Sequence, residues 1–323
     1  MLQESVEETE REALALLALS DIKGVGFETL KQLARNHIAL NMVFQSDFNP
    51  NLNRRIALDP VFSRLRDLFS TEAARQSALD KARYKIDYLN QRQIRIVMRD
   101  SQDYPAGLND LKDSPPWLFV EGSTDALHMK SVTAVGSRKV TDDGSWLASY
   151  LGYCLEELNA VTVSGLALGI DQIVHKASLA ANLPTIAVLG SGILSDYPRG
   201  SEKLRQSIVE QGGAIITEYL PNDTVSAKNF VRRNRIQAAL GNVVIPIEWS
   251  LKSGTAHTVK FASDLQRPLL FVRTPNQPTF DWLPSSYRSE GFIFDLPKEH
   301  GRFIDTVRHN LSSVQSQKNF FED

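Results

Sequence analysis

The sequence TIAVLGSG at residues 185–192 decides the fold together with two earlier segments, SVTAVGSRKV (131–140) and VTVSG (161–165). In each segment the apolar residues run continuously instead of alternating with polar ones, and a stretch rich in helix formers follows. Strands of this composition are buried on both faces of a parallel sheet. The same rhythm continues in AIITE (214–218), NVVIPIE (242–248) and PLLFV (268–272). We therefore predict an α/β domain over residues 128–275, with an extended Rossmann-like, doubly wound, mostly parallel sheet.

The preceding part of the chain has a different character. Residues 1–95 contain many good helix formers and no convincing strand alternation, which predicts a small all-helical domain of the SAM-like type. The segment IKGVG (22–26) lies between two amphipathic stretches and is typical of a helix-hairpin-helix turn. Its glycines either let a phosphate approach backbone N–H groups or supply a positive φ in a tight corner, and both interpretations stay open. Residues 96–127 are expected to form a connecting extension, and residues 276–323 a C-terminal tail.

The composition is that of an ordinary globular protein. Hydrophobic residues make up 42% and charged residues 23% of the 323 positions, and the net charge is −2. No stretch approaches the roughly 20 apolar residues of a membrane span, and the acidic N-terminal residues do not resemble a signal peptide, so we expect a cytoplasmic protein. Cys154 is the single cysteine and the six histidines form no close pair. We therefore expect no disulfide, no metal site and no cofactor.

Small and basic residues gather where the predicted strands end. Ligands of open parallel sheets bind at the carboxyl ends of the strands, where short side chains leave backbone N–H groups uncovered for an anion. For any single glycine at a strand end, close packing of a helix on the sheet is a simpler explanation than ligand binding. Packing does not explain, however, why cationic residues occur at the same strand ends. The residues that we predict to contact a phosphate in these loops are Ser137, Arg138, Lys139, Gly165, Gly169, Ser253, Gly254 and Thr255.

The segment NFVRRNR (229–235) gives the sharpest single signal. From Val225 to Arg235 the chain carries four cations and no acidic residue, so a confined positive patch can exist on an acidic protein. Three arginines within four positions cannot all face a core, and Phe230 beside them offers a stacking surface for a base. The alternative is a solvated helix start with a buried phenylalanine, in which Asn234 and Arg235 orient the loops. The predicted contacts with nucleic acid are Lys228, Phe230, Arg232, Arg233, Asn234 and Arg235.

Enzymatic interpretations are weaker. GSG (190–192) follows a strand but lacks the third glycine of a dinucleotide fingerprint, and neither a P-loop nor a G-x-S-x-G motif is present. Asp171 and His175 lie four positions apart, and Glu218 and Glu248 end two strands, which allows an acid/base pair. We favour a buried histidine that is hydrogen-bonded to the aspartate, and we expect no catalytic residue.

Six longer motifs occur in order between residues 104 and 272: AVGSRKVTDDG, VSGLALGIDQIVHKASL, TIAVLGSGILSDYPRGSEKL, GGAIITEYLP, FVRRNRIQAAL and VIPIEWSLKSGTAHT. Together they resemble the DNA-processing protein A (DprA/Smf) family. The resemblance implies an extended Rossmann domain that dimerises, binds single-stranded DNA in a positive pocket and loads a RecA-type strand-exchange recombinase during natural transformation. It assigns DNA contacts to Ser137, Arg138, Phe230 and the Arg233-Asn234-Arg235 motif.

The sequence also departs from the family pattern. Arg273-Thr274-Pro275 stands where the family usually has a Pro-Gly pair, and Trp249 and His257 replace smaller residues near the SGT loop. The winged-helix domain often found at the C-terminus of the family is missing from this sequence. Our leading hypothesis is a non-catalytic single-stranded DNA-binding protein that forms a homodimer and touches no membrane.

Two rival hypotheses come from other functional classes. The departures at His257 and Arg273 motivate a sensor of a nucleotide-derived small molecule, for example in defence against foreign DNA. A hydrolase of nucleoside monophosphates is the third hypothesis, but the PGGxGTxxE motif that it requires is absent.

Overall fold

The computed structural model describes residues 2–35, 38–45 and 60–318, and the chain divides into two compact units. The first unit comprises Met1–Tyr104, Pro115–Glu121 and Glu218–Leu220. The second unit comprises Pro105–Ser114, Gly122–Thr217 and Pro221–Asp323. The predicted series of parallel strands falls in the second unit.

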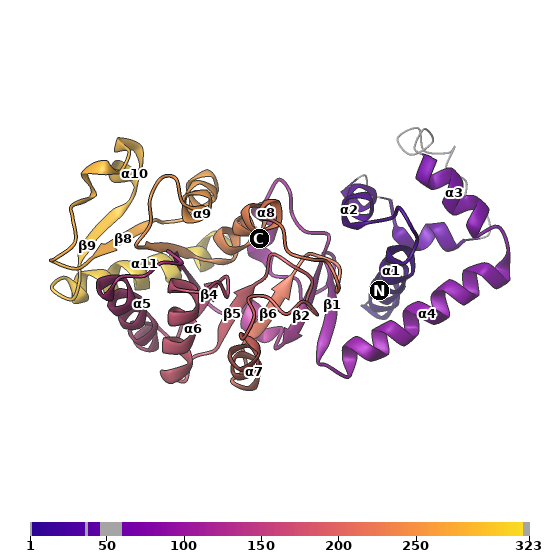
Figure 1. Ribbon diagram of the computed structural model, residues 1–323, viewed down its shortest axis with the longest axis horizontal. Coiled ribbons are helices and arrows are strands. Elements are labelled where there is room, and N and C mark those ends of the chain that lie inside the picture. Colours follow the sequence, from indigo (N-terminus) through magenta and orange to yellow (C-terminus); the bar gives the residue numbers. More distant parts are fainter. Residues whose placement is uncertain (1, 36–37, 46–59, 319–323) are drawn as a thin grey trace. The chain divides into compact units, whose positions relative to one another are not determined.

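The first unit is mainly helical (Figure 1). Its elements are α1 (Leu2–Ser20), α2 (Phe27–Arg35), η1 (Leu40–Phe44), α3 (Pro60–Leu68), α4 (Glu72–Asn90), β1 (Ile94–Met98) and β2 (Trp117–Gly122), the last two paired antiparallel. Side-chain caps set two helix starts. The Thr71 hydroxyl accepts the Ala74 N–H at 3.3 Å before α4, and the Glu12 carboxylate accepts two N–H groups where η1 begins. The helical N-terminal part that the sequence predicts is confirmed.

The second unit contains a parallel sheet. Its strands are β3 (Ser131–Gly136), β4 (Val161–Ser164), β5 (Thr185–Val188), β6 (Ala214–Thr217) and β7 (Val243–Ile247), in the order β6-β5-β4-β3-β7. All neighbouring pairs in this series run parallel, as predicted. The chain steps from β3 to β6 in one direction and then returns to β7 on the other side of β3. The strand order therefore reverses between β3 and β7, which is the place where doubly wound folds bind ligands.

Helices cover both faces of this sheet (Figure 1). On one face are α5 (Asp142–Cys154), η5 (Leu155–Leu158), α6 (Ile170–Ala180) and α11 (His300–Lys318), and on the other are α8 (Ala227–Leu240) and α9 (Gly254–Asp264). Further short elements are η3 (Ala106–Asp110), η4 (Asp125–His128) and α7 (Glu202–Glu210). Strand β7 shows the two-faced burial directly, because Ile245 packs into the core that contains α5 and Val244 into the core that contains α9. This is why its apolar residues are continuous.

The C-terminal part differs from the expectation. Strand β8 (Leu270–Arg273) pairs in parallel with β9 (Phe292–Asp295), which the sequence analysis did not predict, and an isolated parallel bridge between Val244 and Leu269 is its link to β7 of the main sheet. Between them lie η6 (Phe280–Trp282) and α10 (Ser285–Glu290). Phe294 and Phe303 are fully buried in the core that contains α5 and α6, so residues 292–311 are structural and not an appended tail. Burying each such side chain contributes about 1.5–3 kcal/mol.

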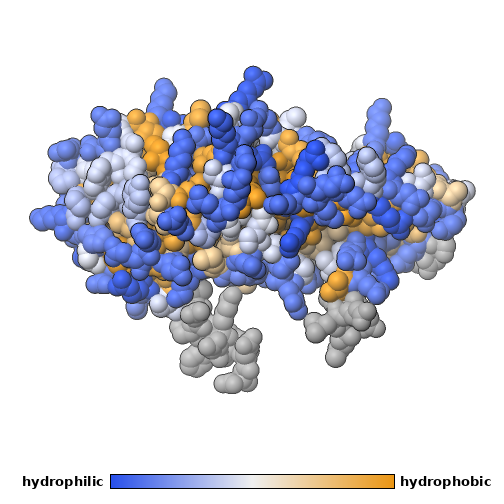
Figure 2. Space-filling view, turned by 90° about the horizontal axis from the view of Figure 1, so that it is seen from below, coloured by the Kyte–Doolittle hydropathy of each residue, from blue (hydrophilic) through white to orange (hydrophobic). Residues whose placement is uncertain are grey.

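One face of the surface is mostly polar (Figure 2). On the face drawn in Figure 2, hydrophilic residues predominate and hydrophobic ones occur in small groups between them. Within the residues that the structure describes, no helix is both long enough and apolar enough to span a bilayer.

Candidate nucleic-acid interface

Arg138 and Phe230 come together from different parts of the second unit. Arg138 lies in the loop after β3 and is exposed, and Phe230 lies in the first turn of α8. The guanidinium carbon of Arg138 is 5.4 Å from the centroid of the Phe230 ring, and the Tyr197 ring is 5.2 Å from the same ring. A cation over an aromatic face at this distance is a favourable pair. The structure thus joins two of the residues that the sequence analysis predicted to contact DNA.

Local structure fixes both partners. The Ser137 hydroxyl accepts the Lys139 N–H at 3.1 Å and also donates to the Lys139 carbonyl, which closes the turn that carries Arg138. Ser226 caps the start of helix α8, because its hydroxyl accepts the Asn229 N–H at 3.1 Å. The side chains of Lys139 and Lys228 are exposed beside these turns. We define the basic-aromatic surface as Arg138, Lys139, Lys228 and Phe230.

Gly190, at the end of β5, makes room for the aromatic ring. A Cβ at this position would lie 2.6 Å from Cδ1 of Phe230. Gly190 is therefore needed for close packing against the Phe230 ring. This agrees with the explanation that strand-end glycines serve packing and need not bind a ligand.

The sequence analysis expected that the three arginines of the 232–235 segment cannot all face the core, and the structure buries two of them and part of the third. Arg233 and Arg235 are only 4% and 3% exposed, and the Arg232 side chain only 14%. Asp113 supplies the partner that the sequence analysis missed: its carboxylate lies 3.3 Å from Arg232 Nη2 and 3.6 Å from Arg235 Nε. Charged guanidinium groups tolerate burial when they are paired in this way. Arg232 and Arg235 therefore support the start of α8 from inside.

Arg233 and Asp171 form the centre of a second buried network. Arg233 donates to the Val188 carbonyl, and a Cβ at Gly165 would overlap its guanidinium group. Burial raises the pKa of Asp171, while the Arg233 charge, a side-chain hydrogen bond from the Ser164 hydroxyl and the backbone N–H groups of Gly136 and Ala167 oppose the rise. The Gly165 N–H also donates to this carboxylate, at 3.2 Å. Loop N–H groups that we predicted to bind a phosphate are thus satisfied by an internal carboxylate.

Other predicted site residues hold the loop before α9. The Asn234 side chain donates to the Gly254 carbonyl at 3.0 Å, and the Ser253 hydroxyl donates to the Ser250 carbonyl at 2.6 Å. Thr255 is buried and Gly254 is exposed. Gly169, with φ of +89°, packs against the backbone of Ser137 and Arg138, so a side chain there would collide with the turn.

The four candidate acid/base residues have structural partners. His175 is bonded to Thr185 Oγ1 at 2.7 Å and not to Asp171, so the predicted His–Asp pair is wrong. Burial lowers the pKa of His175 to about 3, which keeps its ring neutral. Glu218, in the first unit, pairs with the buried Lys31 at 2.8 Å. Both carboxylate oxygens of Glu248 accept the Thr141 N–H, at 3.1 Å each, where α5 begins.

An arginine from a distant part of the sequence lies against the glycine turn of the first unit. Gly24 has φ of +91°, which fits the tight-corner interpretation. Arg64 of α3 donates to the Lys23 carbonyl at 2.8 Å and so lies against the turn. Contact of this turn with a phosphate stays a prediction.

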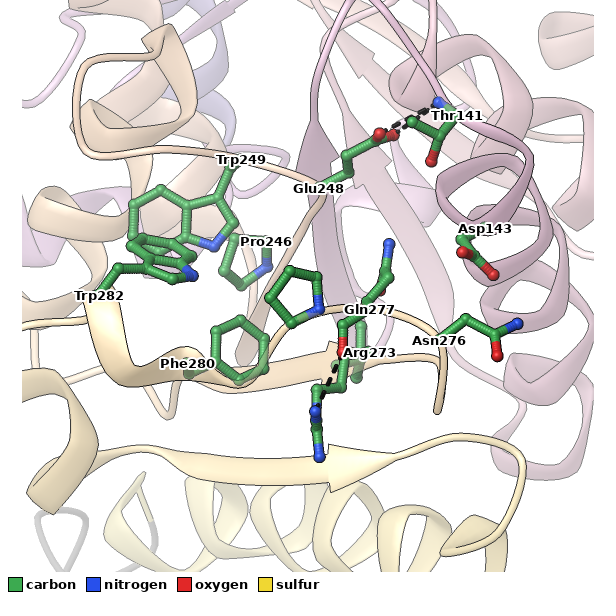
Figure 3. A pocket seen from close by; sticks show the side chains of 12 residues that line it. Thr141, Asp143, Pro246, Glu248, Trp249, Arg273, Asn276, Gln277, Phe280 and Trp282 are labelled. Carbon is green, nitrogen blue, oxygen red and sulfur yellow. Dashed lines mark hydrogen bonds between the residues drawn. The ribbon is translucent and has the colours of Figure 1, made fainter.

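A cavity of about 410 Å³ opens beside the carboxyl ends of β7 and β8 (Figure 3). Its lining includes Trp249 and Arg273, two of the positions where the sequence departs from the family pattern. These two departures from the family pattern are the only sign of the cavity in the sequence. Its lining residues come from four separate segments of the chain, so no local motif marks the cavity.

Comparison with known proteins agrees with these motifs. Residues 95–281 match the family model described as DNA recombination-mediator protein A. Protein Smf of Escherichia coli (strain K12) is 38% identical over 192 residues, which cover 58% of this chain and 50% of that protein. Protein Smf of Synechocystis is 32% identical over 268 residues, 81% of this chain and 64% of that protein. The chain therefore spans about half to two thirds of the length of these relatives.

Two solved structures share the fold. DNA processing protein A from Streptococcus pneumoniae has a TM-score of 0.58 at 23% identity over 81% of this chain and 95% of that one. DNA processing protein A from Helicobacter pylori, whose structure concerns its single-stranded DNA binding mode, has a TM-score of 0.58 at 28% identity over 67% of this chain and 95% of that one. The matched family region contains the parallel sheet, the basic-aromatic surface and both buried arginine networks. The chain belongs to the DNA recombination-mediator protein A (DprA/Smf) family.

Proposed function

We propose that this protein binds single-stranded DNA without sequence preference on the basic-aromatic surface. The observation that carries the proposal is the Arg138–Phe230 pair, which places an exposed cation and an aromatic ring together at the carboxyl end of the sheet. Among the described residues, no acidic side chain forms an ion pair with Arg138, so its charge remains available to a phosphate. The similarity to the Helicobacter pylori protein, whose structure concerns single-strand binding, supports the same proposal.

Each group has a defined part in the proposed contact. Arg138 and Lys139 bind strand phosphates through charge-assisted hydrogen bonds. A base stacks on Phe230, an interaction worth about 1–3 kcal/mol per base. Arg233, Asn234 and Arg235 do not touch the strand but hold the loops in place, because their side chains are buried. This division replaces the sequence-based proposal that all of these residues contact DNA.

The binding should depend on salt but less steeply than that of a strongly basic protein. The net charge of −2 gives no general attraction for DNA, so the local cations Arg138 and Lys139 carry the electrostatic contribution. Neutralising about two phosphates of a single strand gives a slope of about −1.4 in a plot of log affinity against log salt.

Further properties follow from the family resemblance and belong to the same proposal. The protein forms a homodimer, protects single strands and hands them to a RecA-type recombinase in transformation or recombination, without catalysing a reaction itself. Light scattering after size-exclusion chromatography measures the dimer. A strand-exchange assay, in which single strands are first coated by a competing single-strand-binding protein, measures the loading.

Fluorescence anisotropy with labelled oligo(dT) tests the binding. Arg138→Ala should weaken binding about tenfold or more, because a hydrogen bond to a charged group contributes about 1.5–3 kcal/mol. The matched control is Arg92→Ala, which removes an exposed arginine that lies 3.7 Å from the Tyr88 ring in the first unit. Equal affinity of Arg138→Ala and the wild type would refute the assignment, as would equal losses in the two variants.

A further inference from the structure

The cavity beside β7 and β8 lies next to the point where the strand order reverses. It is enclosed by the end of β7, the end of β8, the start of α5 and the segment 276–282. All these segments belong to the second unit. A volume of about 410 Å³ falls in the range of roughly 300–1,000 Å³ that small-molecule pockets occupy.

One wall of the cavity is aromatic. The rings of Trp249 and Trp282 meet edge to face, with centroids 5.2 Å apart and an interplanar angle of 74°. The Phe280 centroid is 5.9 Å from that of Trp282, and Phe271 supports Trp249 from behind at 6.2 Å. This cluster presents π-faces to the space, as an aromatic stacking platform requires.

The opposite wall carries two carboxylates, Glu248 and Asp143 (Figure 3). Glu248 is held by the Thr141 N–H and has φ of +46°, so its position is set by the backbone. Asp143 Oδ1 accepts the Thr274 hydroxyl at 2.9 Å. A carboxylate offers about four lone-pair positions, so both groups retain acceptor capacity toward the cavity.

A phosphate does not suit this space. Arg273 is the single cationic residue of the lining, and its Nε lies 2.6 Å from Asp295 Oδ1 while Nη1 donates to the Gln277 carbonyl at 3.1 Å. Its charge is therefore compensated, and a phosphate would face Glu248 and Asp143 instead. The wall accepts hydrogen bonds, so the complementary ligand is flat, aromatic and rich in N–H donors along one edge.

We propose that this cavity binds a guanine base, stacked on Trp282 and edged by Trp249, with its N1–H and N2 amino edge directed to Glu248 and Asp143. Guanine fits because its Watson–Crick edge presents adjacent N–H donors, and protein sites read such edges by hydrogen bonds combined with stacking. The base comes either from a free nucleoside or from a single strand, and in both cases the phosphates remain outside. This site goes beyond single-strand binding on the basic-aromatic surface and does not depend on it.

Titration with nucleosides, followed by calorimetry and by tryptophan fluorescence, tests the ligand. Guanosine should bind saturably and about tenfold or more tighter than inosine, which lacks the N2 amino group, or 1-methylguanosine, which lacks N1–H, because each lost hydrogen bond to a charged group costs about 1.5–3 kcal/mol. Equal affinity for the three nucleosides would overturn the proposal, and so would the absence of saturable guanosine binding at millimolar concentration.

A pair of tryptophan variants tests the location. Trp282→Ala should weaken guanosine binding about tenfold, as expected when a stacking contact of about 1–3 kcal/mol is lost. Trp146→Ala is the matched control, because Trp146 is also 40% exposed and stacks on Tyr150 outside the cavity. Both variants should keep the wild-type melting temperature within a few degrees. Unchanged guanosine affinity in folded Trp282→Ala would overturn the location.

Oligonucleotides distinguish the two sources of the base. One dG within oligo(dT) should raise the affinity of the wild type but not of Trp282→Ala if the base comes from a strand. If free guanosine is the ligand, the dG has no effect while guanosine binding persists. Failure of both arms refutes the cavity proposal, whereas failure to bind plain oligo(dT) refutes only the proposed single-strand binding.

Discussion

The backbone N–H of Gly165 donates a hydrogen bond of 3.2 Å to the buried carboxylate of Asp171. An internal carboxylate thus accepts a loop N–H that we had predicted, from the sequence, to bind a phosphate. The strand-end loops thus enclose an internal carboxylate that accepts their N–H groups, with the Arg233 charge near it. The surface that we propose for a nucleic acid is therefore the outer turn, with Arg138 and Phe230.

The internal anion can be tested through stability. Asp171→Asn keeps the shape of the side chain but removes the carboxylate charge near Arg233 and replaces an acceptor of the loop N–H groups with an amide, so the free energy of unfolding should fall by about 1–3 kcal/mol. Urea denaturation of the variant, beside the control Asp196→Asn at an exposed position of the same unit, measures the loss. A loss below about 0.5 kcal/mol, the range of neutral surface substitutions, would contradict the network.

The neutral His175 predicts a pH dependence. Its pKa is lowered from 6.5 to about 3 by burial, so below pH 6.5 the unfolded chain binds a proton that the folded protein does not. The stabilisation is fully present above pH 6.5 and is lost as the pH falls toward 3. Between pH 7 and pH 5 the free energy of unfolding should fall by about 2 kcal/mol more in the wild type than in His175→Gln. Parallel curves for the two proteins would refute this assignment.

Cys154 should be chemically inert in the folded state. Burial is the main cause that raises the pKa of its thiol to about 11. The thiolate fraction at pH 8 is therefore roughly two orders of magnitude below that of an unperturbed cysteine with a pKa near 8.5. A disulfide reagent at pH 8 should react at least 100-fold more slowly with the native protein than with the urea-unfolded chain, by the same reasoning about thiolate reactivity. Similar rates would show that the thiol is accessible.

Gly190 should affect DNA binding through Phe230. Gly190→Ala places a Cβ against the Phe230 ring, which must then move away from Arg138. Affinity for oligo(dT) should fall about tenfold, in line with the loss of one stacked base. Gly301→Ala is the control, because a Cβ there meets no atom within 4 Å. Unchanged oligo(dT) binding in Gly190→Ala would show that the ring position is unimportant.

The main sheet could be predicted from the sequence because its strands obey a simple rule. Buried parallel strands such as β3 and β7 have continuous apolar runs, and the helix after each one leaves little freedom for other topologies. Strand β8 has the same composition, yet it pairs with β9 in a separate sheet. Composition alone cannot distinguish these two outcomes, because both bury the strand equally.

The sequence could anticipate the location only of exposed and half-buried residues of the candidate site. Arg138 and Phe230 were found because turn position and residue type suffice to place them. The burial of Arg232 depends on Asp113, which lies 119 positions away in the sequence. The Gly165 N–H, which the sequence pattern assigned to a phosphate, donates to Asp171 of the following helix instead. The residues that line the cavity come from four segments of the chain, so no local sequence pattern predicts the cavity.

Photo-crosslinking tests the central claim most directly. Oligo(dT) that contains 4-thiothymidine is irradiated with the wild-type protein, and the crosslinked peptides are identified by mass spectrometry. The basic-aromatic surface predicts crosslinks in residues 137–139 and 227–231, which are lost in Phe230→Leu but retained in the control Tyr88→Leu of the first unit. Crosslinks confined to the first unit, with none at these two turns, would contradict the account.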